Sequence, residues 1–364
     1  MGFRQLKIKS LSVIVSMAII SSLLLPTASL HSQAILLPLQ KGMCYVTWDK
    51  DRFASEYSDA SLEKLASLGV EYLSICTTHY QEKYNSTKIK RTDKTPSKIS
   101  LTHVIKRAHK LGMKIMLKPH IDLIDKYDGT YWRADIGFAS EKEWEKWFSE
   151  YQKLILHYAN MSKRLKVELL CIGTELSFTT QKDPEWRKLI AEVRKVYSGE
   201  LVYAANWDNF KNIRFWDELD YIGIDAYFPL TYAPSPSKED LKKGWEKWKD
   251  DIEQWQKRVN KPVIFTEIGY PSTSHAPYTP WKSGTDGNAN PDLQAQCYEA
   301  FFDTMWEEPW LAGVYWWKWD TNTSAGGKHN RQFTPQNKPA QDVLETYYKG
   351  CDRDIAYAAQ ENLQ

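Results

Sequence analysis

Residues 262–270 read PVIFTEIGY, an apolar run that carries a single acidic residue, Glu267, before a glycine and a tyrosine. A second stretch, residues 167–177, reads VELLCIGTELS and places Glu175 after a similar run. Near-continuous apolar runs of this length are typical of parallel strands that are covered on both faces. We therefore predict two buried parallel strands here, at residues 262–270 and 167–176, each with a glutamate toward its carboxyl end.

Six further apolar runs predict strands elsewhere in the chain, at residues 42–48, 72–79, 114–120, 201–207, 221–228 and 313–319. Helical segments with a period close to 3.6 alternate with the strands, at residues 59–68, 102–111, 141–162, 185–197, 241–259, 293–306 and 340–348. Gly69 and Gly112 follow the first two helices, as expected of helix C-caps. Alternation without a block of consecutive strands predicts an α/β fold, a (β/α)8 TIM barrel that forms a single catalytic domain.

A doubly wound nucleotide-binding sheet is the main rival architecture. It is disfavoured because no G-x-G-x-x-G follows the first predicted strand and no Walker sequence occurs. The net charge of +2, from 48 basic and 46 acidic residues without a basic arm, argues against a nucleic-acid partner. The 16 tryptophans and 21 tyrosines are unusual, and a minority of them suits a cleft that binds the apolar faces of sugar rings.

The first 34 residues predict a secretory signal peptide. Arg4, Lys7 and Lys9 precede an almost wholly apolar run at residues 11–25, and small residues follow at 26–29, with Ala34 as a second cleavage point. An uncleaved membrane anchor is the alternative, although the run is shorter than the ~20 residues that a span prefers. We therefore expect a secreted or periplasmic protein, with a catalytic domain over residues 35–364 and no membrane span in the mature chain.

The five cysteines predict neither a disulfide framework nor a zinc site, because their number is odd and no C-x-x-C pair occurs. Buried thiols are expected at Cys44, Cys76 and Cys171, which lie inside apolar runs. A bridge that involves Cys297 or Cys351 remains open. We expect no metal and no cofactor.

The two glutamates predict the chemistry, because reactive groups of a parallel barrel lie at the carboxyl ends of its strands. Burying a carboxylate costs several kcal/mol unless the group is paired, and two of them across one barrel mouth suit retaining glycoside hydrolysis. One carboxylate attacks the anomeric carbon and the other protonates the leaving oxygen. We predict a separation of about 5–5.5 Å between Glu175 and Glu267, the distance typical of retaining enzymes.

A barrel with glutamates ending strands four and seven resembles clan A of the glycoside hydrolases. Within this clan the chain resembles family 113, the β-1,4-mannanases, in stretches that span the mature chain: IGTEL at 172–176, FWD at 215–217, DYIGIDAY at 220–227, TEIGY at 266–270, WWKWD at 316–320, FTP at 333–335 and KPA at 338–340. The resemblance implies that Glu175 is the acid/base and Glu267 the nucleophile. It also implies a polysaccharide or oligosaccharide of the mannan or glucomannan type as substrate, and we expect a monomer.

Most clan members place asparagine before the acid/base, where it binds the sugar 2-hydroxyl, but here Thr174 takes this position. Asn206, which ends strand five, is a candidate for the missing contact. Tyr227 is a candidate for a hydrogen bond to Glu267. Weaker candidates for substrate contacts are strand-end residues of other strands: Trp48, His79, Lys118, His120, Asp225, Trp316 and Trp317. Side chains alternate along a strand, so only one or two of the strand-eight tryptophans can face inward and form the floor beneath the sugar.

Three other functions remain as alternatives. A metal-dependent hydrolase requires clustered ligands, whereas the eight histidines are scattered with no H-E-x-x-H. A non-catalytic carbohydrate-binding barrel does not require both carboxylates. A clan A enzyme of different specificity, such as a β-glucanase, a xylanase or an exo-β-mannosidase, is the strongest competitor. Long connections occur at 81–100, 229–238 and 272–291, and the first and last of them would decide between the open groove of an endo-acting enzyme and the closed pocket of an exo-acting one.

Overall fold

The structure is a computed structural model that describes residues 2, 38–283 and 287–350. The predicted signal peptide, residues 1–34, lies outside the described residues except for Gly2, so it stays a prediction. Residues 35–364 belong to one compact unit. In the described part of the chain, no helix is both long and apolar enough to cross a bilayer.

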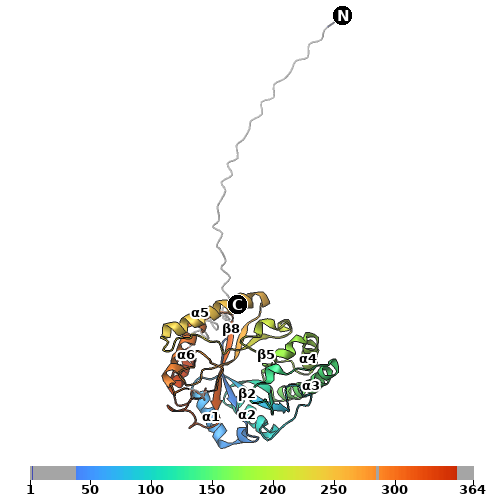
Figure 1. Ribbon diagram of the computed structural model, residues 1–364, viewed down its shortest axis with the longest axis horizontal. Helices are drawn as coiled ribbons and strands as arrows, with labels where there is room; N and C mark the ends of the chain where they lie inside the picture. Colours follow the sequence, from blue (N-terminus) through green and yellow to red (C-terminus); the bar gives the residue numbers. More distant parts are fainter. Residues whose placement is uncertain (1, 3–37, 284–286, 351–364) are drawn as a thin grey trace. The chain divides into compact units, whose positions relative to one another are not determined.

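Eight parallel strands close into a barrel in sequence order, with β1 paired to both β2 and β8. The prediction of a (β/α)8 barrel is therefore confirmed, and Figure 1 shows the helices arranged around the strands. The strands are β1 (Gln40–Val46), β2 (Tyr72–Gln81), β3 (Lys114–Leu123), β4 (Leu169–Thr174), β5 (Glu200–Asn206), β6 (Tyr221–Asp225), β7 (Val263–Ile268) and β8 (Leu311–Asp320).

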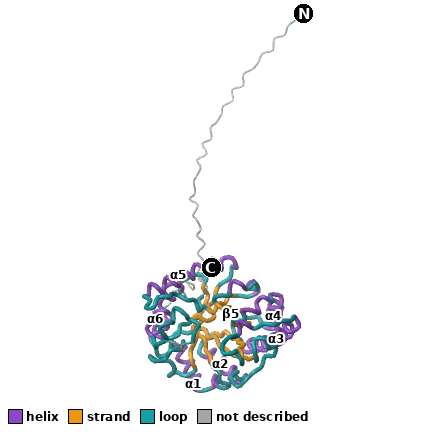
Figure 2. Tube along the Cα trace, in the orientation of Figure 1, coloured by secondary structure: helices purple, strands orange, loops and turns teal. Residues whose placement is uncertain are grey.

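The α-helices surround the strands, as the purple and orange segments of Figure 2 show. They are α1 (Glu56–Ser67), α2 (Lys98–Lys110), α3 (Glu141–Leu165), α4 (Asp183–Val196), α5 (Lys238–Val259), α6 (Pro291–Met305) and α7 (Pro339–Lys349). No α-helix joins β5 to β6. Two 3-10 helices, Phe210–Asn212 and Trp216–Glu218, occupy this connection.

Local sequence signals account for several helix ends. Ser140 and Glu143 form a capping box at the start of α3, which satisfies two backbone N–H groups that have no partner within the helix. Gly69 and Gly112 adopt φ values of +85° and +83° at the second position after α1 and α2, behind Leu68 and Leu111. The predicted glycine C-caps are thus confirmed, because this left-handed conformation is costly for residues with a Cβ atom.

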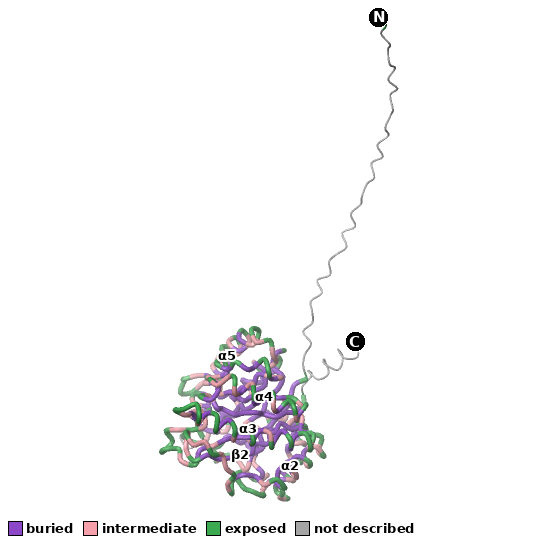
Figure 3. Tube along the Cα trace, turned by 90° about the vertical axis from the view of Figure 1, so that its right-hand side faces the viewer, coloured by how far each residue is buried: buried purple, intermediate pink, exposed green. Residues whose placement is uncertain are grey.

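Two apolar layers form the core. The larger layer lies between the strands and the helices, and the aromatic face of α3 belongs to it through Trp147, Tyr151 and Tyr158. The smaller layer fills the barrel interior and includes Met116, Tyr315 and Cys171. Figure 3 shows this buried interior in purple, with exposed segments outside it. A filled interior leaves only the mouth of the barrel open for chemistry.

Four cysteines, Cys44, Cys76, Cys171 and Cys297, are buried free thiols. The expectation of buried thiols for the first three is confirmed, and Cys297 forms no bridge. Cys351 lies outside the described residues.

Candidate active site

Glu175 and Glu267 line one cavity of about 760 Å³ at the mouth of the barrel. Glu267 lies near the end of β7, and Glu175 directly follows β4. The Glu175 backbone has φ = +53°, a left-handed conformation that costs a non-glycine residue energy and is found disproportionately at functional sites. Only 7% of Glu175 and 4% of Glu267 is exposed, so both side chains are largely buried in the cavity wall. The two glutamates that were predicted at strand ends therefore lie in a shared cavity.

Two donors hold the Glu267 carboxylate. Lys118 Nζ lies 2.7 Å from Oε1, and the Tyr227 hydroxyl donates to Oε2 at 2.7 Å. The hydrogen bond predicted for Tyr227 is thus present. Burial, and then the charge of Glu267, raise the pKa of Tyr227 well above its usual value, so the phenol keeps the proton that it donates. Both carboxylate oxygens of Glu267 therefore accept a hydrogen bond, which fixes the orientation of the group.

Lys118 also lies 3.0 Å from Oδ1 of Asp225, which accepts a further hydrogen bond of 2.8 Å from the Thr266 hydroxyl. Burial would lower the pKa of Lys118, but Asp225 and Glu267 raise it well above its usual value. The ammonium group therefore stays charged between two carboxyls. The side chains of Lys118 and Asp225 are fully buried. Neither side chain reaches the cavity surface, so the two position Glu267 from below. The sequence had suggested that they contact a sugar, and their burial corrects this expectation.

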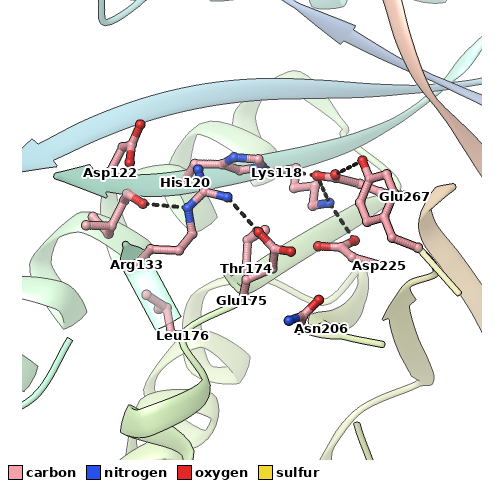
Figure 4. A network of polar contacts seen from close by, with 12 residues as sticks. Lys118, His120, Asp122, Arg133, Thr174, Glu175, Leu176, Asn206, Asp225 and Glu267 are labelled. Atoms are coloured by element: carbon pink, nitrogen blue, oxygen red, sulfur yellow. Dashed lines mark hydrogen bonds and ion pairs between the residues drawn. The ribbon is translucent and has the colours of Figure 1, made fainter. Parts of the chain in front are cut away.

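Glu175 lies across the cavity from this cluster and has a different partner. The Arg133 guanidinium donates from Nη1 to Glu175 Oε2 at 2.7 Å, a contact marked in Figure 4. Burial raises the pKa of Glu175, Arg133 lowers it, and the charge of Glu267 raises it again, with a net upward shift. A carboxyl whose pKa is raised retains a proton closer to neutral pH, as a general acid requires.

His120 and Trp317 line a smaller pocket of about 80 Å³ that also borders Glu267, as the larger cavity does. Their rings lie nearly parallel, with centroids 6.4 Å apart. Burial, together with the charges of Arg133 and Lys118, lowers the pKa of His120 well below its usual value, so the imidazole is neutral. Its buried Nε2 lies 3.9 Å from Glu267 Oε1 and has no hydrogen-bond partner in the described part of the chain.

Trp48 lines the same smaller pocket on the side of β1 and is 46% exposed. Lys318 Nζ lies 4.2 Å from the centroid of the Trp48 ring, and the Trp317–Lys318 peptide bond is cis. Asn206 lines the larger cavity between Glu175 and Tyr227. Its Oδ1 accepts from the backbone of Trp207, and the amide nitrogen is left for another acceptor. Trp48 and Trp317 thus line the smaller pocket and Asn206 the larger cavity, and their contact with a substrate stays a prediction.

Two predicted residues face away from the cavity. The His79 ring packs edge-on against Tyr158 of α3, with centroids 5.7 Å apart. Trp316 is fully buried and stacks on Tyr298 of α6 at 3.6 Å. Both side chains point from their strands toward the helices, because each lies one position out of phase with the inward-facing residues Thr78 and Trp317. This placement corrects the expectation that they contact the substrate.

Several cavity residues were not expected from the sequence. Arg133 lies in a short 3-10 helix between β3 and α3, and other additions come from loops: Lys126, Trp132, Trp207, Asp208, Trp281 and Phe333. Strand-end reasoning cannot find loop residues, because loop conformation is not encoded in a hydrophobic period. The one sequence signal for these loop residues was the large number of tryptophans in the chain. Among the described residues, no group of three or more His, Cys, Asp or Glu side chains is arranged to hold a metal ion.

Comparisons with known proteins agree with this geometry. The model of glycoside hydrolase family 113 matches residues 44–338. Among solved structures, the GH113 β-mannanase AaManA from Alicyclobacillus acidocaldarius is 28% identical, with a TM-score of 0.78 over 87% of this chain and 99% of that chain. A GH113 β-1,4-mannanase structure is also 28% identical, with a TM-score of 0.78 over 86% and 99%.

A β-glucuronidase from Ruminococcus gnavus shares the fold alone, at 14% identity and a TM-score of 0.57 over 86% of this chain and 50% of that chain. No match was found among curated protein sequences. The family match covers most of the chain, and the two carboxyls lie in one cavity of its barrel. The chain therefore belongs to glycoside hydrolase family 113 and is a glycoside hydrolase.

Proposed function

We propose that the enzyme cleaves β-1,4-mannosidic linkages in mannan- or glucomannan-type chains with retention of anomeric configuration. The observation that carries this proposal is the unequal setting of two carboxyls in one cavity. The two carboxylate oxygens of Glu267 accept hydrogen bonds from Lys118 and Tyr227, whereas burial raises the pKa of Glu175. The solved GH113 mannanases, at 28% identity over nearly their whole length, support the choice of mannoside.

In the first step, an oxygen of Glu267 forms a bond to the anomeric carbon while the glycosidic C–O bond breaks. Glu175 transfers its proton to the leaving oxygen, so the departing sugar leaves as a neutral alcohol. Lys118 and Tyr227 orient the attacking carboxylate, and Arg133 orients the acid. The product of this step is a covalent ester between the sugar and Glu267.

In the second step, a water oxygen bonds to the anomeric carbon from the face that the leaving group vacated. The ester bond breaks, its electron pair returns to Glu267, and the water proton passes to the now ionised Glu175. Two inversions at one carbon give net retention. The enzyme returns to its starting protonation state.

Binding of the sugar at the cleavage point is assigned to Trp317, His120 and Asn206. The Trp317 ring offers an apolar face for the sugar ring, and the neutral His120 has an unpartnered Nε2 for a hydroxyl. Asn206 provides an amide for the 2-hydroxyl, in the place of the asparagine that Thr174 replaces before the acid/base. The axial orientation of this hydroxyl distinguishes mannose from glucose.

A hydrolysis screen on mannan, glucomannan, cellulose and xylan oligomers tests the substrate. We expect turnover of the mannan and glucomannan oligomers and the β-anomer as first product in ¹H NMR. Preferential turnover of xylan or cellulose would assign the enzyme a different specificity in the same clan. An α-anomer as first product would reject the double displacement.

A further inference from the structure

Arg133 is the one cation that contacts the acid/base directly in the described part of the chain. Its Nη1 donates to Glu175 Oε2 at 2.7 Å, and its Nε donates to the backbone carbonyl of Ile121 at 3.0 Å. The second contact fixes the guanidinium plane against the end of β3 (Figure 4). The side chain is only 19% exposed, so water screens its charge weakly.

We propose that Arg133 is the positioning residue that makes Glu175 an effective base in the second step. This inference rests on the proposed double displacement. Because Arg133 donates to Oε2, a proton on Glu175 is directed to Oε1, the oxygen that must reach the leaving group. The ion pair thus selects the reacting oxygen as well as the charge state of the carboxyl.

The charged and titratable groups around Glu175 explain why the arginine matters more after the first step. Burial and the negative charge of Glu267 raise the pKa of Glu175, whereas Arg133 and Lys118 lower it. Tyr203, Asp225 and Tyr227 also face this carboxyl. Formation of the ester removes the charge of Glu267 and therefore one of the two causes that raise the pKa of Glu175. Arg133 remains.

Without Arg133, burial would continue to raise the pKa of Glu175 after the ester has formed. The carboxyl would then hold its proton when it must accept one from water. The second step would slow, while the first step, which needs the protonated form, would proceed. The arginine therefore acts on one half of the reaction cycle.

The test uses the full chain with Arg133→Met and Arg133→Lys substitutions and a dinitrophenyl β-mannobioside. The dinitrophenolate of this substrate leaves without protonation, so the first step reports the nucleophile alone. For Arg133→Met we expect kcat to fall about 10–100-fold, within the contribution of general base catalysis. We expect kcat/KM to change less than about 3-fold, because it reports the first step. A burst of dinitrophenolate should appear, and azide, which needs no base, should restore kcat.

Arg133→Lys keeps a positive charge and should retain more of kcat than Arg133→Met. Arg187→Met is the matched control, because Arg187 pairs with Asp183 and Asp217 outside the cavity. A ¹³C-NMR titration of the free enzyme, with Glu175→Gln to assign the signal, needs no substrate. Arg133→Met should move the Glu175 midpoint to higher pH.

Equal losses of kcat and kcat/KM without a burst or azide rescue would overturn the assignment and leave Arg133 a structural role. An unchanged Glu175 midpoint would overturn it as well. A wild type that inverts configuration would instead reject the proposed function, and with it the second step. The anomer of the wild-type product separates these two failures.

Discussion

Glu267 is the proposed nucleophile, and its neighbour Lys118 keeps a second partner when Glu267 is removed. In Glu267→Ala, Lys118 keeps its 3.0 Å contact with Asp225, so the fold should persist. Turnover should fall on the order of 10⁴-fold or more, because no covalent intermediate can form. Azide should restore part of the rate on a dinitrophenyl mannoside and give the α-glycosyl azide, which NMR identifies.

Glu175→Ala provides the comparison at the opposite side of the cavity. A substrate with a good leaving group should retain its first step in this variant, and azide should yield the β-glycosyl product. If both variants hydrolysed mannan oligomers at near-normal rates, the two carboxyls would not be the reacting groups. If the two azide products were exchanged, the roles of the glutamates would be reversed.

The positions of the two carboxyls and the Tyr227 contact were predicted from the sequence, but the loop residues around them were not. A glutamate that ends an apolar run is visible in the chain, because the run predicts both the strand and its direction. The 2.7 Å contact between Arg133 and Glu175 depends on a loop that returns over the barrel mouth. Lys118 was named as a candidate, but its full burial between Asp225 and Glu267 depends on strands β6 and β7, whose residues are 107 and 149 positions away in the chain.

At the scale of the strand, β8 places two neighbouring tryptophans on opposite faces. Trp316 packs against α6, and Trp317 lines the cavity. Trp316→Ala should therefore destabilise the fold by about 3–5 kcal/mol, as other buried aromatic truncations do. Trp317→Ala should lower kcat/KM about 10-fold through the loss of ring contact worth ~1.5 kcal/mol. Urea unfolding and kinetics on mannan oligomers measure the two effects.

The pair of tryptophan variants is its own control, since the substitutions are identical and adjacent. If Trp316 faces the helices and Trp317 faces the cavity, Trp316→Ala should mainly lower stability and Trp317→Ala should mainly lower kcat/KM. A Trp317→Ala variant that loses as much stability as Trp316→Ala, with unchanged kcat/KM, would contradict this assignment of faces.

Strand β2 carries a pH-sensitive contact with α3. Burial, followed by the charges of Arg91 and His157, lowers the pKa of His79 from 6.5 to about 3. Between these two pH values the unfolded chain binds a proton that the folded chain excludes. Stability is therefore lost as the pH falls from 6.5 toward 3. His79→Phe keeps an aromatic ring against Tyr158 and should reduce the stability loss between pH 7 and 4.5.

Urea midpoints at the two pH values measure this difference, and activity at pH 7 is the second readout. Since His79 faces α3, kcat/KM should be unchanged. A large drop in kcat/KM would return His79 to the substrate-binding residues. An identical pH dependence in the variant would place the acid sensitivity elsewhere.

Element boundaries were predicted to within a few residues, and the differences concentrate at the barrel mouth. Residues 221–228 were predicted as one strand, but β6 ends at Asp225. The last three residues leave the ladder, and this departure brings Tyr227 to within 2.7 Å of Glu267. Hydrophobicity continues through this bend, so the pattern extends the strand. No α-helix lies between β5 and β6. The only sign of this in the sequence was the shortness of the connection.

At the scale of the whole molecule, the start of the barrel limits where a signal peptide can be cleaved. Strand β1 begins at Gln40 and pairs with both β2 and β8, and Leu39 before it is buried. Cleavage beyond Leu39 would shorten the strand that closes the barrel, leaving unpaired edges on two neighbours.

We propose that the chain is exported and cleaved between residues 26 and 34. A chain that starts at residue 35 should then match the exported protein in melting temperature and kcat, since every described strand and helix remains. Mass spectrometry of the exported protein gives the cleavage site. An exported form that retains residues 1–25 would favour the membrane anchor, and an unstable chain from residue 35 would show that the barrel needs the preceding segment.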